Sequence, residues 1–368
     1  MKSTTLGAER RTKLAAAMTA NNLEVLIAYG NAWQGDYLMY VSDFPILEGH
    51  GIALLTPDGK CRLYLDSASE IDRATAETAG IEVRFSQQIG RDVAADLKAR
   101  GKVRMAAAPL GFVPFALIEN APGTIEDGTP IVDLCLMHKT PAEVERVRKA
   151  AQTADEAYVI FRQAAQAGRK QFEVVAETES WLRAHGVADN FMLIGSGGTD
   201  IYSVTPPSNR KLTKGDNVIT ELTPSIEGYY AQICRTLVVG KASDAQKRAY
   251  DIYIEALEAG IAAVVPGARA ADVARAENDV FRKYDMGEYV TSAYTRVRGH
   301  GLGLFADSKP HILEDVQVEL RPGMTFVVHP NTYNPNVGYM MLGDSVTVTD
   351  TGVEVFTKTP RVLFESAA

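Results

Sequence analysis

The chain has 368 residues, which is long enough for two domains or one large domain. Its composition, 46% hydrophobic and 23% charged, is that of an ordinary globular protein, and no apolar run approaches the roughly 18 residues that a membrane span requires. The net charge of −8 and the lack of a basic cluster interleaved with aromatic residues argue against nucleic acid as a partner.

The first part of the chain alternates between predicted helices and strands. The turn sequence Pro57-Asp58-Gly59 separates two apolar runs and predicts a hairpin. The predicted segments are a helix at 8–21, a strand at 25–28, hairpin strands at 51–56 and 62–65, helices at 67–79 and 92–100, and short strands around Glu82 and Val103. This alternation predicts a small α/β domain, to which we assign residues 1–138.

The start of a second domain is marked by a helix-capping sequence. Thr140 is a capping residue, Pro141 suits the first helical position and Glu143 stands three residues after the cap. A stripe of apolar residues at helical spacing follows, at Val144, Val147, Ala151, Ala154, Tyr158 and Phe161. We therefore expect a long helix that opens a domain covering residues 139–368.

The second domain shows the same plan twice, two helices followed by strands. The predicted segments are helices at 172–185, 244–263 and 270–284, a strand at 191–194, a strand pair at 218–226 and 229–237, and mostly strand and turn from Tyr289 onward. Gly228 offers the turn between the paired strands. Together the two domains predict an α+β fold class.

Polar residues stand where these strands would bury a site. Glu221 and Gln232 fall on the neighbouring strands of the pair 218–237. His300 has glycine on both sides, which permits close approach of another group, and His329 follows the apolar run Val327-Val328. Histidine exchanges protons near neutral pH and a carboxylate can act as a general base, so these residues are candidates for catalysis.

The motifs around these residues resemble the catalytic domain of the creatinase, prolidase and aminopeptidase P superfamily, the M24 or "pita-bread" family. The shared frame comprises Lys214-Gly215-Asp216, Gly228-Tyr229, Cys234-Arg235-Thr236, Gly299-His300-Gly301, Pro322-Gly323-Met324 and Asp344-Ser345-Val346. The resemblance implies a C-terminal pita-bread domain preceded by the smaller α/β domain.

The resemblance also marks five positions at which metal-dependent members of the family carry ligands. In this chain they hold Glu221, Gln232, His300, His329 and Gly343, and only the histidine at 300 is unchanged. We therefore expect a divergent member that lacks most metal ligands, is closest in kind to creatinase-like metal-independent hydrolases and has no metal cofactor.

The leading hypothesis is a metal-independent creatinase-like hydrolase that cleaves a C–N bond of a small polar compound. His300 and His329 would exchange protons with water and the leaving nitrogen, Glu221 would orient substrate or water, and Gln232 would polarise the scissile group. The family's two helper histidines are replaced, the first by Val204 and the second by the pair Asp307-Ser308.

Further residues are assigned to substrate binding. They are Gln232, Tyr202, Ser203, Arg298, His311, Tyr339, Met341, Glu48 and His50. His311 would partly replace the second helper histidine, and Arg298 would anchor an anionic group. Glu48 and His50 belong to the loop 44–51, which in creatinase-like enzymes reaches the active site of the partner subunit; the resemblance thus implies a homodimer.

Three alternatives stay open at this point. A mononuclear metal-dependent hydrolase would bind one Mn, Zn or Fe ion through His300, His329, Gln232 and Glu221. A lyase would use the same groups to remove a proton next to a leaving group. A non-catalytic binder of a small molecule or protein would keep the fold without the chemistry. The sequence does not name the substrate.

Cysteine usage bears on the compartment. Cys61, Cys135 and Cys234 are odd in number and widely spaced, which predicts buried thiols rather than a disulfide framework. The first twenty residues carry several charges and no apolar core. We expect a soluble, cytoplasmic protein.

Overall fold

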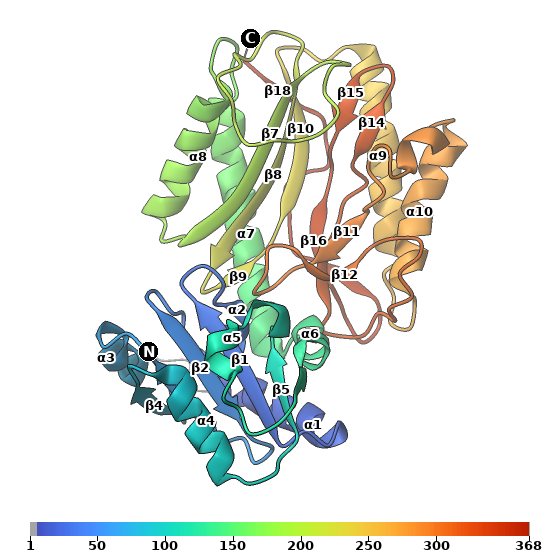
Figure 1. Cartoon of the computed structure of the whole chain (residues 1–368). Coiled ribbons are helices and arrows are strands. Elements are labelled where there is room, and N and C mark those ends of the chain that lie inside the picture. Colours follow the sequence, from blue (N-terminus) through green and yellow to red (C-terminus); the bar gives the residue numbers. More distant parts are fainter. Residues whose placement is uncertain (1–5, 368) are drawn as a thin grey trace. The chain divides into compact units, whose positions relative to one another are not determined.

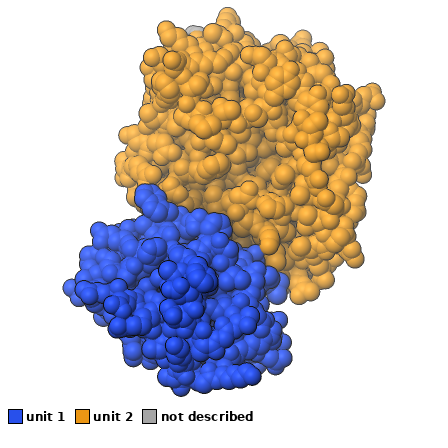
Figure 2. Space-filling view, in the orientation of Figure 1, with its two compact units in different colours: residues 1–136 blue, residues 137–368 orange. Residues whose placement is uncertain are grey.

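The computed structural model describes residues 6–367 and divides the chain into two compact units, the first ending at Leu136 and the second beginning at Met137 (Figure 2). The division predicted from the capping sequence falls after residue 138. Both units combine helices with sheets, as the α+β class requires. Each unit is described by itself below.

The first unit is built on a six-stranded mixed sheet in the order β4-β3-β2-β1-β5-β6. Its central strand β1 (Val25–Asn31) pairs antiparallel with β2 (His50–Leu55) and parallel with β5 (Met105–Ala108). The outer strands are β3 (Cys61–Leu65), β4 (Glu82–Phe85) and β6 (Ile125–Asp127). The predicted hairpin is confirmed: β2 and β3 are antiparallel, and Gly59 in their turn has a φ of +79°.

Helices cover this sheet. They are α1 (Leu6–Ala20), α2 (Asp36–Ser42), α3 (Ser69–Glu77), α4 (Ile89–Ala99), α5 (Phe115–Ile118) and α6 (Thr129–Met137), with a 3-10 turn η1 at Leu110–Phe112. The predicted helices at 8–21, 67–79 and 92–100 correspond to α1, α3 and α4, whereas α2, α5 and α6 were not predicted. Ile89, Val93 and Leu97 of α4 pack with Ile27 and Tyr29 of β1 in the core.

The second unit opens with α7 (Pro141–Ala164), and the predicted capping box is present. The backbone N–H of Glu143 donates to Thr140 Oγ1 (3.3 Å), and the backbone N–H of Thr140 donates to Glu143 Oε2 (2.8 Å). The predicted apolar stripe is buried along most of its length, at Val147, Ala151, Ala154, Tyr158 and Phe161. This face of α7 packs on the first sheet of the unit.

The first half of the second unit consists of α7, α8 (Gln171–Ala184) and a five-stranded sheet in the order β18-β10-β8-β7, with β9 paired to β8 (Figure 1). The strands are β7 (Asp189–Gly197), β8 (Asn217–Ile226), β9 (Tyr229–Tyr230), β10 (Ile233–Val239) and β18 (Phe364–Ser366). Glu227 and Gly228 both have positive φ, +50° and +80°, and form the predicted tight turn after β8.

The second half repeats the plan with α9 (Asp244–Ala262), α10 (Ala270–Lys283) and a sheet in the order β12-β11-β13-β16-β17 (Figure 1). Its strands are β11 (Gly299–Gly301), β12 (Ser308–His311), β13 (Thr325–Val328), β16 (Asp344–Val348) and β17 (Val353–Val355). A 3-10 turn η2 (Gly287–Val290) and a small sheet of β14 (Thr332–Asn334) and β15 (Gly338–Met340) complete it. The plan of paired helices followed by strands is thus realised twice.

Two sequence expectations can be compared directly with the described residues. Across residues 6–367, no helix combines the length and the apolar character needed to cross a membrane. Cys61, Cys135 and Cys234 are free thiols and all are buried, as predicted.

Candidate active site

Glu221 lies in the middle of β8, directly opposite Cys234 of β10 in the antiparallel register. Burial, and then the negative charge of Asp307, raise the pKa of the Glu221 carboxyl to about 7. A carboxyl that titrates near neutral pH can take up and release a proton under physiological conditions. Glu221 therefore has the protonation behaviour of a general acid or base.

His300 stands at the centre of β11 between two glycines that leave no room for side chains. A Cβ at Gly299 would lie 2.0 Å from the carbonyl oxygen of Val327, and a Cβ at Gly301 would lie 2.2 Å from that of Lys309. The glycines thus allow β11 to fit between β12 and β13. Burial lowers the pKa of His300, so its imidazole is neutral near pH 7.

His329 follows β13 and is 4% exposed. Its ring centroid lies 5.4 Å from that of His300, and the two planes are inclined by 63°. Burial, followed by the neighbouring His300, holds the pKa of His329 well below its usual value. The two imidazoles therefore form a neutral pair in a buried position.

Two buried polar atoms near the imidazoles are not satisfied by the protein. Within residues 6–367, neither Gln232 Oε1 nor His329 Nδ1 has a hydrogen-bond partner. The backbone of Gln232, in contrast, is tied to Ser345 Oγ, which accepts from its N–H (2.9 Å) and donates to its carbonyl (2.8 Å). Buried polar atoms usually have partners, and the cost of lacking one is about 1–3 kcal/mol. Both atoms are thus available to a bound molecule.

Glu221 and the imidazole pair are joined through neighbours on two sides. Cys234, opposite Glu221, exchanges backbone hydrogen bonds with Gly343, and a Cβ at Gly343 would lie 2.7 Å from the Cβ of His329. On the other side, Asp307 lies 3.9 Å from His300 Nδ1 while its charge raises the pKa of Glu221. Cys234, Gly343 and Asp307 thus link Glu221 of the first half to the imidazole pair of the second half.

Asp307 was not among the residues predicted for the site. Its Oδ1 lies 3.0 Å from His311 Nε2, so it contacts the exposed His311 as well as the buried His300. His300 and His311 are register partners, and the ladder shifts between His300 and Gly301. The sequence offered one signal, namely that Asp307 follows the Gly-His-Gly segment and precedes His311 by four residues.

At position 343 the protein has no room for a side chain. A Cβ there would lie 2.7 Å from His329 Cβ and 3.1 Å from Cys234 Cβ. The adjacent Asp344 is committed elsewhere: its oxygens accept from Arg235 Nη2 (2.7 Å), Thr357 Oγ1 (2.9 Å) and Arg361 Nε (2.7 Å). Neither residue presents a free carboxylate to the imidazoles.

The two arginines of this region are structural. Arg298, predicted to anchor an anionic group, is fully buried and donates to Asn278 Oδ1 and to the carbonyls of Asn331 (2.8 Å) and Thr295 (2.7 Å). Arg235 is equally buried and donates to Asp344 and to three carbonyls. The predicted anchoring role of Arg298 is not supported, because its guanidinium already has partners within the protein.

Tyrosines and Met341 lie on the side of this site that contains Cys234. Tyr339 and Met341 are buried together with Cys234 in one apolar cluster, and the Tyr339 hydroxyl is 2.9 Å from Thr295 Oγ1. Tyr202 is 59% exposed, and its ring stacks on Tyr333 at 4.7 Å. Ser203, next to it, is exposed. Of the four predicted binding residues Tyr202, Ser203, Tyr339 and Met341, the two buried ones lie beside the residue opposite Glu221.

The remaining predicted residues, Glu48 and His50, belong to the first unit. Glu48 Oε2 accepts from Ser67 Oγ (3.1 Å) and Ser69 Oγ (2.6 Å). His50 Nδ1 lies 2.8 Å from the Tyr29 hydroxyl. With the exposed Trp33 and Leu47, these residues border a hollow of 330 Å³.

Comparisons with known proteins agree with this architecture. Residues 145–350, more than half of the chain, match the profile of Metallopeptidase family M24. The chain belongs to this family. The predicted M24 membership and fold class are therefore confirmed, and so is the hydrolase class at the level of the family.

Curated relatives of this chain include dipeptidases. The Xaa-Pro dipeptidases of Pyrococcus furiosus and Pyrococcus horikoshii are 29% and 28% identical over 227 residues, which cover 61% of this chain and 64% of each relative. The match thus spans less than two thirds of these relatives. Among solved structures, the dipeptidase PepE from Mycobacterium ulcerans is 25% identical with a TM-score of 0.84, covering 100% of this chain and 99% of that chain. An Xaa-Pro dipeptidase from Bacillus anthracis has a TM-score of 0.85 over 98% and 99% at 24% identity, which shows the fold alone.

The comparisons correct the function expected from the sequence. A metal-independent, creatinase-like hydrolase without a metal cofactor was expected, but the matched family is a metallopeptidase family and the named relatives are Xaa-Pro dipeptidases. An aminopeptidase P of the same fold is described in a zinc-substituted form. The predicted metal-independent, creatinase-like function and the expected lack of a metal cofactor are therefore wrong.

The donor set of this M24 member was tested against the metal cluster that the family name implies. Among the described residues, no three His, Cys, Asp or Glu side chains form a group that could hold a metal ion. Gln232 brings an amide and Gly343 leaves no space for a ligand. The side chains present do not fit a two-ion cluster, nor the alternative single site of His300, His329, Gln232 and Glu221.

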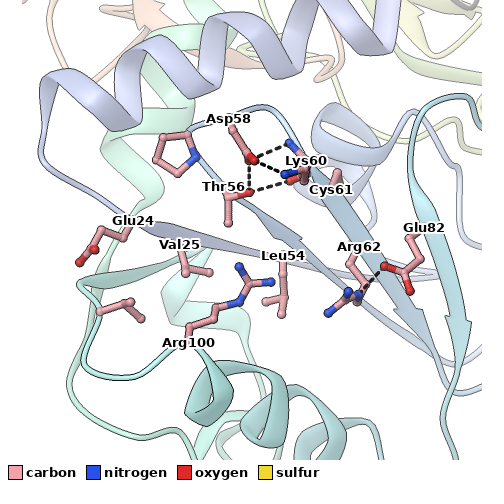
Figure 3. Close-up of a pocket in the computed structure, with 12 residues that line it drawn as sticks. Glu24, Val25, Leu54, Thr56, Asp58, Lys60, Cys61, Arg62, Glu82 and Arg100 are labelled. Atoms are coloured by element: carbon pink, nitrogen blue, oxygen red, sulfur yellow. Dashed lines mark hydrogen bonds and ion pairs between the residues drawn. The ribbon is translucent and has the colours of Figure 1, made fainter.

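A larger hollow of 530 Å³ in the first unit does not compete with this site (Figure 3). Four of its charged side chains form ion pairs: Arg62 with Glu82 (2.7 Å) and Lys60 with Asp58 (2.7 Å). The Thr56 hydroxyl also donates to Asp58 (2.6 Å). The hollow lacks an unpartnered catalytic group among its described lining residues.

Proposed function

We propose that this M24 member hydrolyses the C–N bond of a small peptide-like compound. The proposal is supported by its family, whose named relatives are dipeptidases. The observation that carries it is the Glu221 carboxyl, whose pKa is raised to about 7 and which Asp307 and the Cys234–Gly343 pair link to two neutral imidazoles. Such a group can accept a proton from water and return it at the same pH.

The reaction consists of two proton movements. In the first, the oxygen of water forms a bond to the carbonyl carbon, and the proton released goes to the Glu221 carboxylate. In the second, the C–N bond breaks and Glu221 returns that proton to the leaving nitrogen. Burial holds the pKa of Glu221 near 7, so at neutral pH the carboxylate can accept the proton and the protonated form can return it.

The neighbouring polar atoms orient the substrate. Gln232 Oε1 accepts a hydrogen bond from a substrate N–H, and His329 Nδ1 bonds either to water or to the substrate, depending on its tautomer. His300, whose ring lies against that of His329, limits the orientation of the second imidazole. These contacts would hold the C–N bond in position for Glu221.

We further propose that the chain is a divergent M24 member. Support comes from the residues at the five positions where the family resemblance places ligands: Glu221, Gln232, His300, His329 and Gly343. Because of the crowding at Gly343 and the ion pairs of Asp344, neither position supplies a carboxylate to this site.

The proposal is tested by hydrolysis assays with tag-free protein. Substrates are Xaa-Pro dipeptides, other dipeptides and N-acyl amino acids, each with and without added Mn²⁺, Zn²⁺ or Co²⁺, and the metal content of the protein is measured. We expect release of an amine or amino acid, and a loss of about 10²-fold or more in kcat for Glu221→Gln. Glu258→Gln, on the exposed face of α9, is the matched control.

Two results would contradict this proposal. One is a lack of turnover of every compound under every metal condition by folded protein. The other is a Glu221→Gln variant as active as Glu258→Gln. The second result would show that Glu221 does not transfer the proton.

We also propose that the chain acts as a homodimer in which the first unit reaches the partner's site. Trp33 and Leu47, 90% and 64% exposed, stand beside Glu48 and His50, and exposed large apolar groups are typical of interfaces. Light scattering should give a dimer mass, and Trp33→Ser should shift it toward the monomer. A monomeric wild-type protein would exclude the assembly.

A further inference from the structure

Four tyrosines of the second unit form one continuous aromatic cluster, which we call the tyrosine wall: Tyr202, Tyr289, Tyr294 and Tyr333. Tyr333 stacks on Tyr202 at 4.7 Å and on Tyr294 at 5.8 Å between ring centroids. Tyr289 completes the wall, 4.9 Å from Tyr294 and 5.6 Å from Tyr333. The rings come from three separate segments: the loop after β7, the region of η2, and β14.

The wall is continuous with the proposed active site. Tyr289, Tyr294 and Tyr333 pack in the same apolar cluster as Tyr339 and Cys234. Cys234 is the register partner of Glu221. A molecule whose reacting bond lies at Glu221 therefore has the wall within a few side chains of it.

Two tyrosine hydroxyls of this cluster are already hydrogen-bonded within the protein, so these residues can contact a ligand only through their rings. The Tyr333 hydroxyl donates to the carbonyl of Thr199 (3.0 Å), and that of Tyr339 is bonded to Thr295 Oγ1 (2.9 Å). Tyr202 nevertheless remains 59% exposed, and Tyr294 is partly exposed. An exposed ring stack whose buried hydroxyls are engaged recognises a ligand by its π faces and edges.

The charge that acts on the wall residue Tyr294 is negative, whereas the positive charge of Arg298 acts on Tyr339, outside the wall. Burial, and then the charge of Glu288, raise the pKa of Tyr294; burial likewise raises that of Tyr339, with a smaller contribution from Glu221. Two arginines on this side are paired with carboxylates, Arg210 with Asp216 (2.6 Å) and Arg296 with Asp315 (2.5 Å). Arg298 donates to amide and carbonyl oxygens and keeps its charge, which acts on Tyr339. These surroundings favour a cation over an anion.

We propose that the tyrosine wall is a subsite for an organic cation, an alkylammonium or protonated amine carried by the substrate. Tyrosine faces attract such cations within about 6 Å of the ring centroid. This inference rests on the proposed function for the location of the scissile bond, and it names the substrate class: a peptide-like compound with a cationic group at one end. The wall then sets specificity, while Glu221 serves the reaction.

The test compares two probes of nearly equal shape. Choline and its neutral carbon isostere 3,3-dimethylbutan-1-ol are titrated into the full-length protein by calorimetry. We expect choline to bind at least about tenfold more tightly, and Tyr202→Leu to weaken choline about fivefold while leaving the isostere unchanged. Tyr284→Leu, an exposed tyrosine at the end of α10, is the matched control and should change neither.

Three outcomes would overturn the subsite: equal or tighter binding of the neutral isostere, no saturable binding of choline, or an equal loss in Tyr202→Leu and Tyr284→Leu. Because the titration needs no turnover, it is separate from the hydrolysis assay. Choline binding without hydrolysis of any compound would contradict the proposed function but not the subsite. Hydrolysis without choline selectivity would sink the subsite alone.

Discussion

Each half of the second unit buries one arginine completely, and the two are stabilised in opposite ways. Arg235 of the first half is held by a charged partner, the Asp344 carboxylate, which Arg361 also contacts. Arg298 of the second half is held by neutral oxygens from Asn278, Asn331 and Thr295. Burial would lower the pKa of both guanidinium groups, but only for Arg235 does the Asp344 charge reverse the shift.

Two buried acids, Asp344 and Glu221, differ in the same way: one has a charged partner and the other does not. Burial would raise the pKa of Asp344, yet the charges of Arg235 and Arg361 outweigh it and hold the pKa below its usual value. Glu221 has no such cation, and its pKa rises to about 7. The comparison teaches that one fold keeps a permanently ionised carboxylate for structure and a titrating one for chemistry, and that the position of the arginines decides which is which.

The largest expected effect comes from removing the structural charge. Asp344→Asn leaves Arg235 fully buried without its anion, and breaking a buried ion pair costs about 3–5 kcal/mol. Asn278→Ala removes a neutral partner of Arg298 and should cost less, about 1.5–3 kcal/mol. Urea unfolding at pH 7 measures both. The contrast between the arginines is wrong if Asn278→Ala is the more destabilising of the two.

A somewhat smaller effect is expected from the titrating acid. Between its unfolded pKa of 4.5 and its folded pKa of about 7, Glu221 keeps a proton that the unfolded chain has released. Rising pH therefore lowers the free energy of unfolding across this window, by about 3 kcal/mol at 1.36 kcal/mol per pKa unit. Glu221→Gln cannot lose this proton, so the variant should match wild type below pH 4.5 and be more stable above pH 7.

The measurement is the free energy of unfolding of wild type minus that of the variant at several pH values. In this difference the contributions of the other titrating groups cancel. Glu258→Gln, on the exposed face of α9, controls for the loss of one carboxylate. If the difference between wild type and Glu221→Gln stays constant from pH 4.5 to 7, the carboxyl is not desolvated in solution.

Local signals in the sequence were enough to predict much of the fold. The Thr140 to Glu143 capping box and the apolar stripe after it give α7, because both depend only on contacts within one helix. The turn at Gly228 likewise gives the β8 hairpin. Helix α2 was not predictable in this way, since Tyr37, Tyr40 and Val41 are weak helix formers and packing, rather than propensity, determines their conformation.

The site was only partly predictable. The family frame pointed to Glu221, His300 and His329; the structure places the two imidazoles side by side and links Glu221 to them through Asp307 and the Cys234–Gly343 pair. Asp307 was missed because its contacts with His300 and His311 require β12 to fold back on β11 with a register shift, and no local pattern encodes that. Arg298 was misjudged for the same reason: its partners Asn278 and Asn331 are distant in sequence, so its charge looked available when it is not.

The smallest expected effect concerns the position between the two regions. Gly343 separates Cys234 of the first half from His329 of the second, and a Cβ there would lie 2.7 Å from His329 Cβ. Gly343→Ala must displace one of them, at a cost of about 1–3 kcal/mol as for other overpacked sites. Gly352→Ala, where a Cβ meets nothing within 4 Å, is the control. The displaced group would include the His329 imidazole, which adjoins His300. We therefore expect kcat to fall by a larger factor than the loss of stability alone explains. An alanine variant with wild-type stability and wild-type turnover would contradict the close packing of the two halves at Gly343.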